Sequence, residues 1–147
     1  MELVEIHELA EKKKWMKRFR RAFKNSGGGD PDLIYSDLCR FFVTKDNGHE
    51  LGFIRINNKT KFWKDEYDFE VWNAADGFVK RQHRGKGVLK FMLKNVIENH
   101  QVKMCCLHSD QYSKHLKYYR DLGFVSESKG KDSELYWLYQ KDINPYL

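Results

Sequence analysis

Two glycines stand among cationic residues near the middle of the chain, in the segment Gln82-His83-Arg84-Gly85-Lys86-Gly87. Glycine lets a phosphate group approach the main chain closely, because no Cβ blocks the way. Backbone N–H groups at the start of a helix also attract anions. With Arg84, Lys86 and Lys90 adding positive charge, the segment predicts a site for a diphosphate group.

A strand and a helix flank this segment. Phe78-Val79-Lys80 has the character of a strand end, and the apolar residues of 85–100 recur three and four positions apart, which predicts an amphipathic helix. The first N–H groups of such a helix have no partner within it. The residues alone also allow two alternatives. A glycine pair can simply ease a strand-to-helix turn, and a dinucleotide-binding fold would need a third glycine where Lys90 stands.

The spacing Gln82-x-x-Gly85-x-Gly87, after a strand ending near Val79, resembles the Q/R-x-x-G-x-G/A signature of the GNAT superfamily. The segment Tyr119-Arg120-Asp121-Leu122-Gly123-Phe124 is similar to that family's Tyr-x-x-x-Gly-Phe motif. The resemblance implies acetyl-CoA as cofactor and an N-acetyltransferase that moves an acyl group to a primary amine. The residues expected at the cofactor are Phe78, Val79, Lys80, Gln82, His83, Arg84, Gly85, Lys86, Gly87 and Val88.

The resemblance covers the order of elements over nearly the whole chain, but its specific residues lie between Val79 and Phe124. One departure concerns the helix before the tyrosine motif. Many members of the family have Asn and Ala seven and four residues before that tyrosine, where this chain has Tyr112 and His115. Because of this departure, the resemblance does not carry the family's pantetheine contacts over to that helix.

Acyl transfer to an amine needs a base, because a lysine-like amine with a pKa of about 10.4 is protonated at neutral pH. Glu70 and Asp76 are the nearest carboxylates on the strand that leads to the glycine segment. A bulge near Gly77 would invert which side chains face a groove, so alternation leaves both open. We favour Glu70, since Asp76 before Gly77 also suits a turn. By resemblance, Tyr119 protonates the leaving sulfur, and a backbone N–H near Val79 polarises the thioester carbonyl.

The histidines and cysteines give no pattern typical of a metal site. The chain has 6 His and 3 Cys, without a Cys-x-x-Cys or His-x-x-x-His pair. Cys105 and Cys106 are adjacent in an expected strand, so their side chains point to opposite faces. We therefore expect no metal and no disulfide framework.

Turn chemistry marks the boundaries of the elements. Asn47-Gly48 predicts a hairpin turn, and Asp30-Pro31 predicts the start of a second helix with Leu33, Ile34 and Leu38 facing inward. The expected strands are 3–9, 40–45, 50–57, 69–80, 102–107, 124–126 and 134–140, and the expected helices are 11–25, 31–39, 85–100 and 112–122.

This order, β-α-α-β-β-β-α-β-α-β-β, predicts a mixed α/β fold. The family resemblance implies a central, mostly antiparallel sheet, a V-shaped splay between two parallel strands, and helices on both faces. The 147 residues fit one acyltransferase domain, 1–147.

Charge indicates an acidic partner, since 27 Lys and Arg stand against 21 Asp and Glu. Many of these cations lie in the expected helix 11–25. In the family that the chain resembles, the first two helices flank the acceptor groove, so the resemblance implies an acceptor amine on an acidic macromolecule such as a protein. A basic nucleic-acid-binding module and a catalytically inactive CoA-binding regulator are the alternatives. No run of 18 apolar residues and no basic leader occurs, so we expect a cytoplasmic protein without membrane contact, as a monomer or homodimer.

Overall fold

The structure is a computed structural model that describes residues 1–23, 30–99, 104–110, 125–127 and 134–140. The chain divides into two compact units, Met1–Asn57 with Ala75–Leu93, and Asn58–Ala74 with Lys94–Leu147. The expectation of a single domain stays a prediction. Strand β4 (Val71–Val79) and helix α3 (Val88–Asn99) each contribute residues to both units.

The first unit contains the strand order β1-β2-β3-β4. Its other strands are β1 (Glu2–Ile6), β2 (Cys39–Asp46) and β3 (His49–Asn58), and β2 pairs antiparallel with both neighbours. The predicted hairpin is confirmed. Asn47 and Gly48 have φ values of 50° and 79° between β2 and β3, which the mirror-image turns of tight hairpins require.

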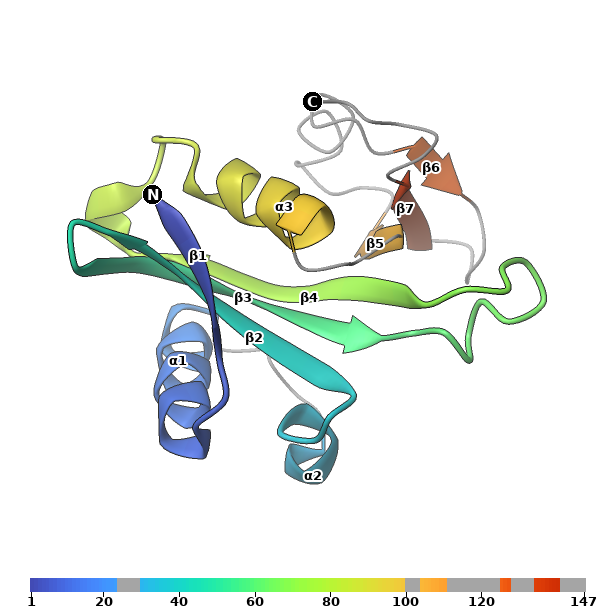
Figure 1. Cartoon of the computed structure of the whole chain (residues 1–147), viewed down its shortest axis with the longest axis horizontal. Helices are drawn as coiled ribbons and strands as arrows, with labels where there is room; N and C mark the ends of the chain where they lie inside the picture. The colour runs from blue at the N-terminus through green and yellow to red at the C-terminus, as the bar shows by residue number, and fades with distance from the viewer. Residues whose placement is uncertain (24–29, 100–103, 111–124, 128–133, 141–147) are drawn as a thin grey trace. The chain divides into compact units, whose positions relative to one another are not determined.

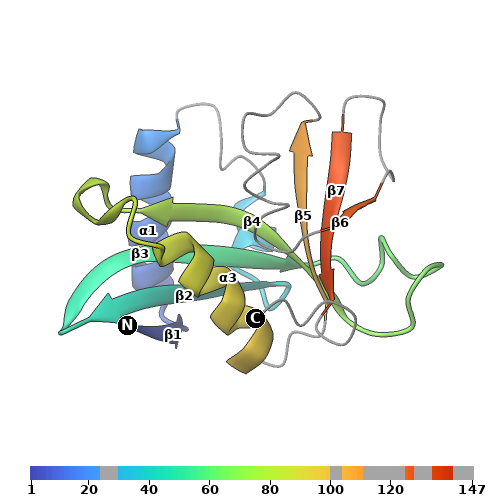
Figure 2. The ribbon, with the colours of Figure 1, turned by 90° about the horizontal axis from the view of Figure 1, so that it is seen from above.

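Helix α1 (Leu9–Ala22) covers one face of these strands, and the start of α3 covers the other (Figures 1 and 2). Trp15, Met16 and Phe19 are buried on α1 and pack in one cluster with residues of β2 and β3 such as Phe41 and Phe53. Burying such large apolar side chains is the main force that holds a helix on a sheet. The amphipathic pattern expected for 11–25 is therefore confirmed.

Helix α2 (Pro31–Ile34) is shorter than predicted. Asp30 caps it as expected, since its Oδ1 accepts a hydrogen bond from the Asp32 N–H at 2.9 Å. The expectation that it extends to residue 39 is wrong, because Ser36 Oγ donates to the Leu33 carbonyl at 2.7 Å and accepts from the Leu38 N–H. Side chains that bond locally to the backbone end helices in this way. Leu33 and Leu38 are consequently exposed rather than inward-facing.

The second unit contains the parallel part of the sheet. The first residues of β4 pair with β5 (Met104–Asp110) in parallel, from Val71 with Met104 to Asn73 with Cys106. Strand β7 (Glu134–Gln140) lies between β5 and β6 (Val125–Glu127) and pairs antiparallel with both. The mixed, mostly antiparallel sheet is as predicted, and the expected helix 112–122 lies outside the described residues.

Several element boundaries differ from the prediction by a few residues, and two of these differences have clear local causes. Strand β1 ends at Ile6 rather than at residue 9, since α1 already begins at Leu9. Helix α3 begins at Val88, because Gly85 and Gly87 have positive φ values that a right-handed helix excludes. Among the described residues, no helix has the length and apolar character needed to cross a bilayer.

Candidate active site

The glycine turn, residues 80–87, joins the end of β4 to the start of α3 and lies within the first unit. After Val79 the chain forms the short 3-10 helix η1 (Arg81–His83), in which the His83 N–H donates to the Lys80 carbonyl at 2.8 Å. Gly85 and Gly87 then take φ values of 76° and 77°. Residues with a side chain rarely adopt this backbone conformation, so both positions favour glycine.

The turn is open where a phosphate group would need to approach. Gly85, Lys86 and Gly87 are exposed, and a Cβ built at either glycine meets no atom within 4 Å. The first bond of α3 runs from the Phe91 N–H to the Gly87 carbonyl at 2.9 Å. The N–H groups of the preceding helical residues therefore have no partner within the helix. Together with the exposed Lys86, this arrangement fits a diphosphate.

A hollow of ≈ 400 Å³ adjoins the turn. It is lined by His83, Lys86 and Val88 of the predicted cofactor contacts and by residues of the β2–β3 hairpin, among them Asp46 and His49. The hairpin residues were not anticipated as neighbours of the turn, because the pairing of distant strands decides which loops meet.

The main chain at Val79 is oriented by its neighbours. The Lys80 N–H donates to the Leu51 carbonyl of β3 at 2.9 Å. Because successive N–H groups of a strand point to opposite edges, the N–H and carbonyl of Val79 point away from β3. Arg84 Nε donates to that Val79 carbonyl at 2.8 Å, and its guanidinium carbon lies 5.6 Å from the centre of the Phe78 ring. Arg84 is exposed at the surface of the turn, and these two contacts fix the turn to the end of β4.

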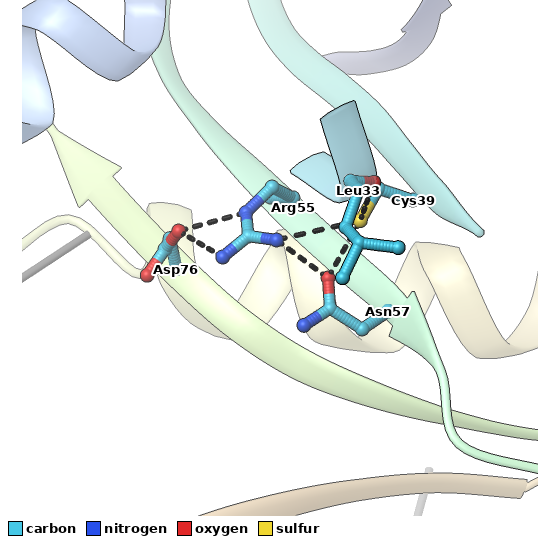
Figure 3. A network of polar contacts seen from close by, with 5 residues as sticks. All are labelled: Leu33, Cys39, Arg55, Asn57 and Asp76. Atoms are coloured by element: carbon cyan, nitrogen blue, oxygen red, sulfur yellow. Dashed lines mark hydrogen bonds and ion pairs between the residues drawn. The ribbon is translucent and has the colours of Figure 1, made fainter. Parts of the chain in front are cut away.

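Asp76 belongs to a buried polar network that joins β3 to β4 (Figure 3). Its Oδ2 accepts hydrogen bonds from Arg55 Nε at 2.7 Å and lies 2.6 Å from Nη2. The third guanidinium nitrogen, Nη1, donates to Asn57 Oδ1 at 2.6 Å and lies 3.4 Å from Cys39 Sγ. The Asp76 side chain is 8% exposed and that of Arg55 is 6% exposed, so each charge is neutralised by the other.

This geometry corrects the interpretation of Asp76 as a turn residue, since it lies inside β4 with its carboxylate bound to Arg55. Sequence reasoning missed Arg55 as the partner of Asp76, and it missed Asn57 and Cys39 as the further contacts of Arg55. One signal was present: Arg55 stands between Ile54 and Ile56 in a buried strand, and a buried cation needs an anionic partner.

Glu70, the favoured base, immediately precedes β4 in the second unit. Its side chain is exposed, and its Oε2 accepts a hydrogen bond from the indole N–H of the buried Trp72 at 3.4 Å. Tyr119, the expected acid, lies outside the described residues. Within the described part of the chain, no three His, Cys, Asp or Glu side chains gather as a metal site would need.

A family model of the acetyltransferase (GNAT) domain matches residues 37–126, more than half of the chain. No curated protein matches the chain in sequence. The matched region contains the glycine turn, the Arg55–Asp76 pair and the Tyr119 motif.

Solved structures of the same fold include FeeM, an N-acyl amino acid synthase from uncultured soil microbes. It is 11% identical with a TM-score of 0.68, and the match covers 97% of this chain and 91% of FeeM. PaiA N-acetyltransferase from Thermoplasma acidophilum, solved in complex with coenzyme A, is 12% identical with a TM-score of 0.62, covering 95% of this chain and 99% of that one. An aminoglycoside 6′-N-acetyltransferase complexed with coenzyme A is 13% identical, with coverages of 95% and 97% and a TM-score of 0.62. At these identities the likeness shows the fold.

Proposed function

The chain belongs to the GNAT family of acetyltransferases, and from this premise we propose that it is an N-acetyltransferase that uses acetyl-CoA to acetylate a primary amine. The observation that carries the proposal is the glycine turn, where Gly85 and Gly87 hold left-handed φ values beside open space at the start of α3. The solved relatives with bound coenzyme A support acetyl-CoA as the cofactor.

Acetyl-CoA supplies the acetyl group as a thioester. In the proposed reaction the main-chain N–H groups from Gly85 onward hold the diphosphate, with Lys86 and His83 beside it. The Val79 N–H, which points away from β3, polarises the thioester carbonyl, because a fixed donor stabilises the oxyanion that develops during acyl transfer.

Two side chains move the protons. Glu70 takes a proton from the acceptor amine, whose nitrogen then bonds to the carbonyl carbon while the carbon–sulfur bond breaks. Tyr119 gives its proton to the departing sulfur, a role that suits a phenol with a pKa of about 10. The ion pair of Asp76 with Arg55 supports Glu70 rather than Asp76 as the general base, since a carboxylate that is bound in a buried ion pair is not available to take a proton from the amine.

The basic surface of α1 supports an acceptor amine on an acidic macromolecule such as a protein. A cytoplasmic location and a monomeric or homodimeric state stay predictions from the sequence.

The cofactor site is tested by measuring, with calorimetry, how tightly three glycine-to-alanine variants bind acetyl-CoA. Gly85→Ala and Gly87→Ala place a methyl group in the path of the diphosphate and strain a positive φ. Gly48→Ala is the matched control, because Gly48 also has a positive φ, 79°, with nothing within 4 Å of its Cβ position. We expect the first two variants to weaken acetyl-CoA binding at least about tenfold, equivalent to about 1.4 kcal/mol, and Gly48→Ala to bind like the wild type.

An assay of turnover distinguishes the proposed transferase from the two alternative functions, a CoA-binding regulator and a nucleic-acid-binding module. Release of the coenzyme A thiol in the presence of amine acceptors supports the transferase. Acetyl-CoA binding without any release of thiol would favour the regulator, whereas salt-dependent nucleic-acid binding without acetyl-CoA affinity would favour the nucleic-acid module.

A further inference from the structure

The positive charge of this protein is concentrated on one helix. Helix α1 has seven Lys and Arg residues against the single acid Glu11, a net charge of +6. The formal net charge of the whole chain is also +6, so the remaining charges cancel. A field of one sign over a single element attracts an oppositely charged partner.

Four of these cations form a stripe along one side of α1. Lys13, Lys17, Arg20 and Arg21 are all exposed, and their spacing of four, seven and eight residues from the first brings them to one side of the helix. The stripe therefore faces solvent, where a partner can reach it.

The stripe forms one wall of a groove whose other wall is α2, which lies on the same face of the sheet (Figure 1). A hollow of ≈ 600 Å³ is lined by the four stripe residues together with Pro31 and Tyr35. A second hollow of ≈ 420 Å³ shares Lys13, Pro31 and Tyr35 with the first and adds His7, Leu9, Lys12 and Asp32. The two hollows thus adjoin as one groove, whose lining residues include five Lys and Arg and one acid, Asp32.

The charges of the groove match an extended peptide. Cations four residues apart on a helix are about 6 Å apart along its axis, and alternate residues of an extended chain are about 6.6–6.8 Å apart on one face. Acidic side chains at alternate positions therefore meet Lys13, Lys17 and Arg21 in turn. Pro31 and Tyr35 provide an apolar floor for the peptide's main chain and small side chains.

Nucleic acid fits the same groove less well. The ring of Tyr35 is stacked on Phe41 with centroids 6.1 Å apart, and Lys13 Nζ lies 5.9 Å from its centre. Both neighbours compete with a base for the ring on which it would stack. In addition, Asp32 in the lining repels a strand that carries an anion at every nucleotide, whereas a peptide can place a neutral or basic residue there.

We propose that the groove between α1 and α2, lined by Lys13, Lys17, Arg20, Arg21, Pro31 and Tyr35, binds an extended acidic segment of the protein that carries the acceptor amine. This inference rests on the proposed function in one respect, that the acceptor is a protein. The groove itself is a docking surface whose occupancy is measurable without turnover.

Fluorescence anisotropy of a labelled peptide tests the groove directly. The peptide carries Glu at alternate positions and one lysine, and its control carries Gln in place of Glu. We expect the acidic peptide to bind more tightly than the control and to dissociate as salt is raised, because exposed ion pairs are screened.

The variant Lys17→Glu/Arg21→Glu reverses two charges of the stripe. Its matched control is Lys61→Glu/Lys64→Glu, which changes the net charge equally at two exposed lysines outside the groove. We expect the first variant to weaken peptide binding about tenfold or more and the control to leave it within about twofold. Circular dichroism confirms that each variant is folded.

Three results would overturn the inference: equal losses in the two variants, no preference for Glu over Gln, or tighter binding of a single-stranded oligonucleotide than of the acidic peptide. Calorimetry with acetyl-CoA on the same variants keeps the two proposals apart. Unchanged acetyl-CoA affinity with lost peptide binding supports the groove. A wild type that binds the peptide but not acetyl-CoA leaves the groove supported and refutes the proposed function instead.

Discussion

Asp76→Asn tests how strongly the Arg55–Asp76 pair holds β3 to β4. The substitution keeps the shape of the side chain and removes its charge, leaving Arg55 charged at 6% exposure. Removing one partner of a buried ion pair costs about 3–5 kcal/mol, because the remaining charge stays out of water. Asn57 Oδ1 still accepts from Nη1 at 2.6 Å, so we expect a loss near the lower limit, about 3 kcal/mol.

Urea and thermal unfolding, followed by circular dichroism, measure this loss. For a chain of this length about 1 kcal/mol lowers Tm by roughly 2–4 °C, so Tm should fall by roughly 6–12 °C. The matched control is Glu5→Gln, which breaks a similar two-bond contact: Arg40 Nε and Nη2 donate to Glu5 at 2.9 and 2.8 Å. The side chains of that pair are 25% and 22% exposed, so water screens the charges and we expect a loss of about 1 kcal/mol or less.

A double variant separates the ion pair from the shape of the site. Arg55→Met with Asp76→Leu removes both charges, and Cys39 Sγ still lies 3.0 Å from Asn57 Oδ1 to satisfy that oxygen. Replacing both ions by apolar groups is often neutral or stabilising, so the double variant should be more stable than Asp76→Asn. The reasoning is refuted if Asp76→Asn costs no more than Glu5→Gln, or if the double variant is the least stable of all.

Two further predictions concern the ends of β4. Gly52→Ala would place a Cβ against the Phe78 carbonyl oxygen, closer than van der Waals contact allows, so β3 and β4 must separate. We expect a loss of about 1–3 kcal/mol in urea unfolding and weaker acetyl-CoA binding by calorimetry. Gly77→Ala is the control, since its Cβ meets only Leu89 Cδ1, at 3.2 Å, and an equal loss in both variants would contradict the prediction. Glu70→Gln should lower kcat by about 10²–10⁴-fold without changing acetyl-CoA affinity. Asp68→Asn, an exposed carboxylate two residues away, should keep its kcat, and a Glu70→Gln variant of normal kcat would exclude Glu70 as the base.

The parts of the fold that depend on local chemistry were predictable from the sequence. The Asn47-Gly48 turn needs only positive φ at two neighbouring residues. The apolar stripe of α3 and the Asp30 cap of α2 depend on residues within one or two turns of each other. The glycine turn was recognised for the same reason, because its two glycines, its strand and its helix are contiguous.

The features that escaped prediction depend on contacts between distant residues. Arg55 and Asp76 are 21 residues apart and meet because of how β3 and β4 lie beside each other, which alternation alone left open. The length of α2 was overestimated because the bonds of Ser36 to its neighbours compete with continuation of the helix.

The end of β4 is held from several directions, and this bears on why the glycine turn can remain open. The Phe78 ring packs 6.4 Å from that of Trp15 on α1, the Lys80 N–H is bound to Leu51 of β3, and the Val79 carbonyl is bound by Arg84. Asp76, two residues before Phe78, is held by its ion pair with Arg55. A site that stabilises charge with main-chain N–H groups works only if those groups are held in place before the reaction. Exposed glycines contribute no packing of their own, so the rigidity of the turn must come from the strand that precedes it, and loosening that strand should impair acetyl-CoA binding even where no cofactor contact is changed.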